Sequence, residues 1–186
     1  MLKEITKESI KAILTKMGYL WFDNEINIIG IRTKDQTPDK FNDFMIISYK
    51  DEFHIFNCTT EPGVYWLKNP MRVSGTFVMK PGQYINKWKL GYHHTYEALV
   101  LAGIIQGWRD YDKDNVVDPD KSKVYSDGKA VNIHHAHENT IQTVIDKYSA
   151  GCQVIQKFSD WLIFIGLVKE AKQEFYTYTL IEENDL

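Results

Sequence analysis

The sequence predicts a mainly β domain, built as a curled sheet or β-sandwich with peripheral α-helices, and three observations support this class. Short runs rich in β-branched and aromatic residues recur at 26–32, 44–49 and 53–57. Turn signals break the middle of the chain at short intervals, namely at 61–63, 69–70 and 80–82. The two clear helical patterns lie near the two ends. In detail we therefore expect an α+β fold with its helices outside the sheet.

The first helix is predicted over residues 6–18. Thr6 is a suitable N-cap, and Gly18 is a suitable stop. Ile5 and Ile10 are spaced as a hydrophobic staple across the N-cap. Apolar residues fall on one face of this helix at Ile10, Ile13, Leu14 and Met17. The pattern predicts a peripheral helix packed by one face.

The second half of the chain predicts further elements. Residues 96–107 contain a continuous apolar run that fits either a helix or a strand, and we favour a buried strand. Ser159 or Asp160 can start a helix that continues to about Gln173. Residues 175–181 then read as a closing strand, and the acidic tail 182–186 is expected to be flexible.

Length and charge limit the classes of function. A chain of 186 residues is most simply one domain, 1–186, that buries a core without a metal or a disulfide. The net charge of −3 gives no broad basic field, so nucleic acid is not an expected partner. The N-terminus lacks the apolar run of a secretory signal, and the apolar run 161–168 is too short to cross a membrane. We expect a soluble protein that is made in the cytoplasm.

The two cysteines have different surroundings. Cys58 ends an apolar, strand-like run, which is typical of a buried and inert thiol. Cys152 follows Gly151 and comes after several histidines, which is typical of a reactive thiol. We therefore expect one structural and one reactive cysteine, with no disulfide between them.

Two neighbouring segments, 131–135 and 149–153, carry a pattern for nucleophilic catalysis. Val131-Asn132-Ile133 reads as a short strand that delivers His134. A cysteine attacks a carbonyl when a base takes its proton and backbone N–H groups receive the negative charge. We predict Cys152 as the nucleophile and His134 as the base, with Gly151 giving the turn its conformational freedom. The predicted chemistry is acyl transfer.

This block resembles the signature of the L,D-transpeptidase (YkuD-like) family, in which a histidine is followed by Ser/Thr-His-Gly-Cys. Residues 135–148 separate His134 from Ser149, which fits the spacing of that family. The sequence departs from the signature at three positions. Ala150 replaces the second histidine, and Gln153 and Val154 replace the Arg/His and Asn that commonly follow the cysteine.

Further segments resemble a divergent branch of the family that is seen in phage endolysin-like and gut-bacterial proteins. The resemblance covers about 27–181, and its other segments are 59–63, 75–77, 80–84, 90–93 and 109–110. It implies an enzyme that acts on peptidoglycan stem peptides through a Cys152 thioester, as an L,D-transpeptidase or an L,D-carboxypeptidase or endopeptidase. A phage lysis protein would act at the host cell wall after release or from the virion.

The resemblance also implies roles for residues around the cysteine. The backbone carbonyl of His135 would orient the ring of His134. Ser149, Gly151 and His93 would contact the substrate or the oxyanion, with His93 standing in for the side chain lost at Ala150. An exposed loop histidine is the simpler interpretation of His93. No metal is expected at this site.

Two other functions fit parts of the sequence. The first is a non-catalytic cell-wall-binding or virion structural module, which the three departures from the signature favour. The second is a zinc-dependent peptidase, because five histidines could supply ligands. Adjacent histidines on a strand point to opposite faces, however, which weakens the zinc hypothesis. These histidines are His93, His94, His134, His135 and His137.

An acidic segment has the spacing of a calcium loop. Carboxylates alternate along it at Asp110, Asp112, Asp114 and Asp118. Asn115 and Lys121 occupy the positions where an EF-hand needs glycine and glutamate. A solvated acidic loop is the simpler interpretation, calcium stays an alternative, and no other cofactor is expected.

Overall fold

The computed structural model describes residues 5–35 and 37–186, and strands dominate it. The described residues form α1 (Lys7–Lys16), β1 (Asn27–Arg32), β2 (Asp43–Tyr49), β3 (Glu52–Thr59), α2 (Val64–Lys68), β4 (Thr76–Met79), β5 (Gly82–His93), β6 (Tyr96–Leu101), β7 (Ile105–Asp110), β8 (Tyr125–Gly128), β9 (Ile133–His135), β10 (Gln153–Ile155), α3 (Phe158–Ala171), β11 (Tyr176–Glu182) and a final 3₁₀ turn, η2 (Glu183–Asp185). The predicted mainly β class with peripheral helices is confirmed.

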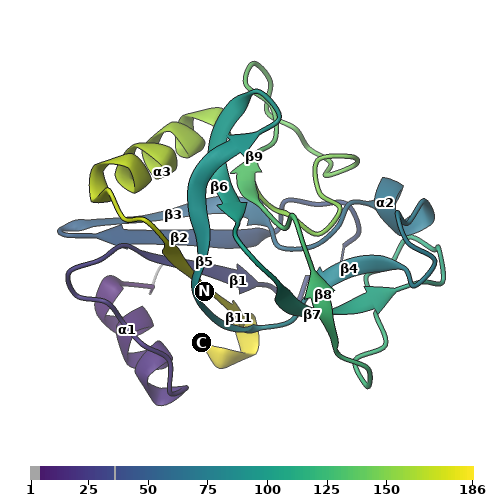
Figure 1. Ribbon diagram of the computed structural model, residues 1–186, viewed down its shortest axis with the longest axis horizontal. Coiled ribbons are helices and arrows are strands. Elements are labelled where there is room, and N and C mark those ends of the chain that lie inside the picture. Colours follow the sequence, from purple (N-terminus) through teal and green to yellow (C-terminus); the bar gives the residue numbers. More distant parts are fainter. Residues whose placement is uncertain (1–4, 36) are drawn as a thin grey trace.

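The strands of the described residues form two sheets. Eight of them close into a barrel in the order β1-β11-β5-β6-β9-β10-β3-β2, so the sheet that we expected to be curled closes on itself. Within it, β1 pairs with β11 and β9 pairs with β10 in parallel. The other three strands form a separate antiparallel sheet, β4-β7-β8. This smaller sheet lies to the right of the barrel strands in Figure 1, with α2 beside it.

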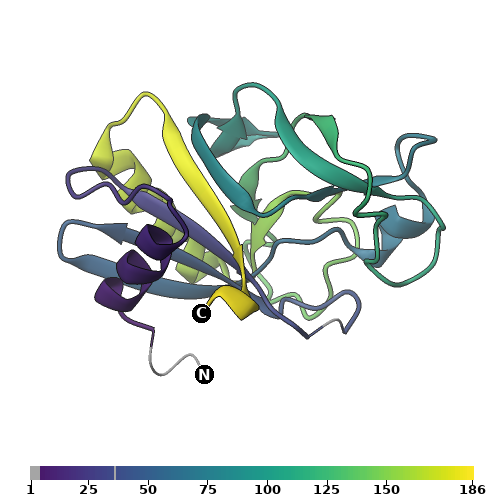
Figure 2. The ribbon, with the colours of Figure 1, turned by 90° about the horizontal axis from the view of Figure 1, so that it is seen from below.

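The main core fills the barrel and continues under α3. Its large side chains include Trp88 and Tyr178 from the strands and Trp161 and Phe164 from α3. A second cluster joins α1 to β1, β2 and β11. Side chains alternate along a strand, so Ile28 of β1 packs in the first cluster, and Ile29 and Ile31 pack in the second. Because both faces of β1 are covered, all six of its residues are buried. Figure 2 shows α1 and α3 beside the barrel strands.

The helix ends test the predicted boundaries. The Thr6 hydroxyl accepts the Ser9 N–H and the Ser9 side chain accepts the Thr6 N–H, so the predicted N-cap of α1 is confirmed. In contrast, α3 follows Lys157, so Ser159 and Asp160 lie in its first turn and cap nothing. The helix begins earlier than predicted because the apolar Phe158 already packs against the core.

The apolar run 96–107 is strand, as favoured, but it is not one strand. β6 ends at Leu101, the chain turns at Gly103 with a φ of +145°, and β7 begins at Ile105 in the other sheet. Apolar content alone did not reveal this turn. In the predicted tail, Glu182 is the last residue of β11, and the Lys34 N–H donates to the Glu183 carboxylate at 2.8 Å.

Among the described helices, none has the length and apolar character needed to cross a membrane.

Candidate active site

Strand pairing brings the predicted nucleophile and base to one face of the sheet. In the parallel pair β9 and β10, Gln153 lies beside Ile133 and Val154 beside His134. The Gln153 N–H donates to the Asn132 carbonyl at 2.9 Å, which extends this register back toward Cys152. Alternate residues share a face, so Cys152, Asn132 and His134 lie on the same side. His134 sits inside β9, whereas the sequence placed it just after a strand at 131–133.

Hydrogen bonding fixes the tautomer of His134. Its Nδ1 lies 2.8 Å from the backbone carbonyl oxygen of His135, the contact that the family resemblance implied. Because a carbonyl oxygen only accepts, Nδ1 carries the proton and Nε2 keeps its lone pair. Burial and the neighbouring His93 lower the pKa of His134 to about 3. The ring is therefore a neutral base at physiological pH.

Nε2 of His134 is buried and has no hydrogen-bond partner among the described residues. The hydroxyl of Tyr96 lies 3.2 Å from Nδ1 and 3.5 Å from the His135 carbonyl oxygen. Since Nδ1 already donates, this hydroxyl is placed to donate to the same carbonyl. Tyr96 thus contacts the Nδ1 side of the imidazole, whereas the predicted proton transfer uses Nε2.

The thiol of Cys152 is half-buried and protonated at neutral pH. Its Sγ accepts the Asn132 N–H at 3.4 Å and donates to the Ala130 carbonyl at 3.5 Å. Burial raises the pKa of Cys152 to about 11, although the Asn132 N–H acts in the opposite direction. In the described part of the chain no hydrogen bond joins Sγ to Nε2 of His134. The resting pair is a neutral thiol and a neutral imidazole.

The turn before Cys152 is built by Ser149 and Gly151. Ser149 is fully buried; its hydroxyl accepts the Gly151 N–H at 3.1 Å and donates to the Cys152 carbonyl at 2.8 Å. Gly151 has a φ of +116°, and a Cβ there would lie 2.6 Å from the Phe77 carbonyl oxygen. These contacts shape the turn, and the substrate or oxyanion contacts that we predicted for Ser149 and Gly151 stay predictions.

The backbone N–H groups near the sulfur are therefore not equivalent. The N–H of Gly151 is occupied by Ser149, and that of Gln153 by the Asn132 carbonyl. For the N–H of Cys152, no acceptor is found within residues 5–35 and 37–186. Cys152 itself, rather than Gly151, offers the free donor for an oxyanion.

Gln153, one of the departures from the family signature, supports the turn from inside the barrel. Its side-chain oxygen accepts the Tyr178 hydroxyl at 2.7 Å, and its side-chain nitrogen donates to the Gly151 carbonyl at 3.2 Å. The residue is fully buried, so it positions the cysteine turn without facing a ligand.

A large pocket opens between the barrel and the smaller sheet. Its volume is about 660 Å³, and Cys152 lines it together with Ala150. Residues of β4, β7 and β8 also line it. Among the charged residues that line it in the described chain, the basic ones outnumber the acidic one, namely Arg72, Arg109, Lys129 and Lys147 against Asp127. Arg109 donates to Asp127 at 2.7 Å, and Arg72 pairs with the same carboxylate.

His93 lies between the pocket and His134. It ends β5 and stacks on His134 with ring centres 4.1 Å apart and planes inclined by 15°. Asn132 Nδ2 donates to His93 Nδ1 at 3.0 Å, since its Oδ1 is taken by the Leu101 N–H at 3.1 Å. Burial lowers the pKa of His93 to about 4. This residue is a half-buried strand residue that lines the pocket, so the exposed-loop interpretation was wrong.

The geometry does not favour the zinc hypothesis. His135 faces the other side of β9, where its ring lies 4.9 Å from Phe158 and 5.7 Å from Trp161. His137 accepts the Asn139 N–H at 3.1 Å in a loop. Across the described ranges, the potential metal ligands that gather as a group of three are Asp110, Asp112 and Asp118, and no histidine joins them.

Two residues of the site were missed from the sequence. Asn132 contacts both Sγ and His93, and its position two residues before His134 was a usable signal for a shared strand face. Tyr96 contacts the His134 ring from β6, and no local pattern pointed to it.

Cys58 is fully buried, its pKa is raised by burial, and both cysteines are free thiols.

Comparison with protein-family models, with curated proteins and with solved structures finds no match to this chain. The function is therefore argued from the site itself.

Proposed function

We propose that this protein is a cysteine acyl-transfer enzyme that acts on peptidoglycan stem peptides, as an L,D-transpeptidase or as an L,D-carboxypeptidase or endopeptidase. One observation carries the proposal. Cys152 lines a large pocket and shares a strand face with His134, a buried histidine whose tautomer leaves Nε2 free to accept a proton. Buried His135 also has unpartnered ring nitrogens among the described residues, so what distinguishes His134 is the strand face that it shares with Cys152.

The proposed reaction proceeds in two halves. Sγ of Cys152 attacks the peptide carbonyl carbon while its proton passes to Nε2 of His134, and the Cys152 N–H binds the oxyanion. The intermediate then collapses, His134 protonates the leaving amine, and a thioester remains. In the second half an amine or water attacks the thioester and returns a proton through His134 to the sulfur. An amine acceptor gives a cross-link, and water gives hydrolysis.

The resting geometry requires one rearrangement before attack. The thiol proton points to the Ala130 carbonyl at 3.5 Å and must turn to His134. Since a neutral pair has no thiolate ready, proton transfer accompanies the attack on the carbonyl.

The charge of the pocket supports an acidic peptide as substrate. Four basic residues, Arg72, Arg109, Lys129 and Lys147, line the same pocket as Cys152 and form its basic wall, and the carboxylate of Asp127 is shared between Arg72 and Arg109. Stem peptides carry free carboxylates, which such a wall attracts.

A second candidate is a non-catalytic module that binds cell-wall peptide through the same pocket. The observation that favours it is the resting state of the thiol, because its pKa is raised and no hydrogen bond joins it to His134 among the described residues. Binding through the basic wall needs neither group.

The test is mass spectrometry of muropeptides incubated with wild type, Cys152→Ala and Cys58→Ala. We expect shortened stems or new cross-links, and a covalent acyl-enzyme, with wild type and with Cys58→Ala but not with Cys152→Ala. The product masses separate hydrolysis from transpeptidation. If no protein changes the muropeptides while all three sediment with intact cell walls, the binding module is the correct function.

A further inference from the structure

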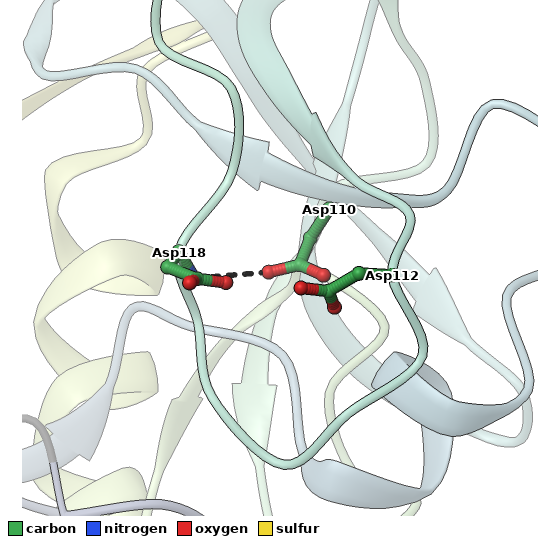
Figure 3. A group of neighbouring side chains, drawn as sticks. All are labelled: Asp110, Asp112 and Asp118. Carbon is green, nitrogen blue, oxygen red and sulfur yellow. Dashed lines mark hydrogen bonds between the residues drawn. The ribbon is translucent and has the colours of Figure 1, made fainter.

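A group of acidic side chains lies outside the pocket that Cys152 lines. It is found at the end of β7 and in the loop that follows this strand. Asp110, Asp112 and Asp118 each place a carboxylate oxygen within 4.8 Å of the others. Figure 3 shows the three side chains turned toward one space, with the loop wrapped around them. A cavity of about 130 Å³ lies beside them.

The decisive observation concerns Asp110. This residue is 1% exposed, and its Oδ2 accepts the Asp118 N–H at 3.0 Å. Its Oδ1 is buried and has no hydrogen-bond partner among the described residues. A buried carboxylate oxygen without a donor is costly, so it requires a charge or donor that protein atoms do not supply. Figure 3 shows the free side of this carboxylate turned toward Asp112.

The protein provides little compensation for the negative charge. Within the described ranges, no Lys, Arg or His forms a salt bridge with any of the three carboxylates. Burial and the neighbouring carboxylates raise the pKa of Asp110 to about 6. Two of the three groups are exposed, so an ion from solvent can reach the cluster.

We propose that Asp110, Asp112 and Asp118 bind one hard divalent cation and that calcium is the preferred ion. Calcium takes oxygen ligands in flexible geometry, and three carboxylates offer up to six oxygen atoms. Magnesium requires a stricter octahedron and gives up its water reluctantly, which a loop of this kind serves less well. The bound ion would neutralise the cluster and provide the missing partner of Asp110 Oδ1.

The sequence pattern placed Asp114 in the same site, and the structure does not. Asp114 Oδ1 accepts the Val116 N–H at 2.6 Å, and the side chain lies outside the group of three. It is an exposed aspartate in the same loop with the same formal charge. Asp114 therefore provides a matched control for the charge of the loop.

The site would also support the pocket. Asp110 follows Arg109 directly on β7, and Arg109 belongs to the basic wall of the pocket that Cys152 lines. An ion that fixes the end of β7 to the loop would hold this wall in place. The cation would thus stabilise the protein without taking part in the reaction.

The experiment is a thermal and calorimetric titration of chelator-treated protein with CaCl₂. We expect wild type and Asp114→Asn to bind one ion and to show a rise in Tm that grows with calcium concentration. The double variant Asp112→Asn/Asp118→Asn changes only exposed groups, so it should fold, and its affinity should fall by about tenfold or more. MgCl₂ at the same concentrations should give a smaller rise.

Three results would overturn the proposal. One is the absence of a calcium effect on wild type. Another is an equal effect on wild type and the double variant, which would mean that calcium binds elsewhere. A rise in Tm that is larger with magnesium than with calcium would overturn the assignment of the ion. None of these readouts depends on the proposed acyl transfer.

Discussion

At the scale of single residues, the chemistry of Cys152 is set by two hydrogen bonds and by its burial. The Asn132 N–H and the Ala130 carbonyl hold the thiol, and its pKa is raised to about 11. Many cysteine enzymes instead keep a thiolate with a lowered pKa. In the proposed reaction the thiol proton would therefore leave during attack, whereas a preformed ion pair has lost it beforehand.

This difference leads to a prediction for alkylation of the free protein by iodoacetamide. The rate for Cys152 should increase about tenfold for each pH unit from pH 7 to 10, because only the thiolate reacts. Cys58, which is fully buried, should stay unlabelled in the folded protein. Peptide mass mapping after timed quenching measures both sites. A rate for Cys152 that does not vary between pH 6 and 8 would indicate a preformed thiolate and contradict the neutral pair.

At the scale of elements, the turn that precedes β10 determines where the sulfur lies. Gly151 adopts a positive φ against the backbone of β4, while Ser149 and Gln153 hold the turn from two sides. Gly166 is a glycine without such constraints. Gly166 lies in α3 and is exposed, and a Cβ added there would meet no atom within 4 Å.

The two glycines predict opposite effects of the same substitution. Gly151→Ala should lower the free energy of unfolding by about 2 kcal/mol or more, because the Cβ would meet the Phe77 carbonyl at 2.6 Å in a strained conformation. Gly166→Ala should raise it by about 0.5–1 kcal/mol through helix propensity. Urea denaturation of both variants gives the comparison. Equal effects would show that the turn is less constrained than described.

At the scale of the whole molecule, buried titratable groups with opposite shifts govern stability against pH. The pKa values of His93 and His134 are lowered from 6.5 to about 4 and about 3. As pH falls below 6.5, the unfolded chain binds these protons first, so the histidines reduce stability. Burial raises the pKa of Glu61 to about 7 and of Asp110 to about 6. These carboxyls gain protons first in the folded state and increase stability as pH falls.

Together these effects should give a free energy of unfolding that first stays level and then declines as the pH falls. Two histidines and two carboxyls oppose each other between about pH 6 and 4.5, so the free energy of unfolding should change little there. The stabilising effect of Glu61 ends near pH 4.5 and that of Asp110 near pH 3.8, whereas His134 lowers stability by up to about 1.4 kcal/mol per pH unit down to its pKa of about 3. Urea titrations in chelator-containing buffers from pH 7 to 3.5 test this. A steady decline that begins at pH 6.5 would contradict it.

Much of this molecule could be predicted from local patterns, and the rest depends on pairing between distant segments. The Thr6 cap and the first three strands follow from residues close in sequence. The barrel closure does not, because it requires β1 to pair with β11 from the other end of the chain. The split of 96–107 between two sheets depends on a turn at Gly103 within an apolar run.

The same distinction applies to the candidate site. The spacing of His134 and Cys152 predicted two residues that strand pairing places on one face. The contacts of Tyr96 and His93 come from β6 and β5, and only the folded sheet brings these strands beside β9 and its neighbours. The roles of Ser149 and Gln153 in the turn depend on burial, which residue identity does not reveal.

The protonated state of Cys152 has a consequence for survival in oxidising surroundings. Peroxides and small disulfides react with thiolates, and the susceptibility of a cysteine follows its thiolate content and its exposure. A half-buried thiol with a pKa of about 11 carries almost no thiolate at neutral pH. We therefore expect the resting protein to resist inactivation by oxidants and to keep this sulfur reduced at neutral pH.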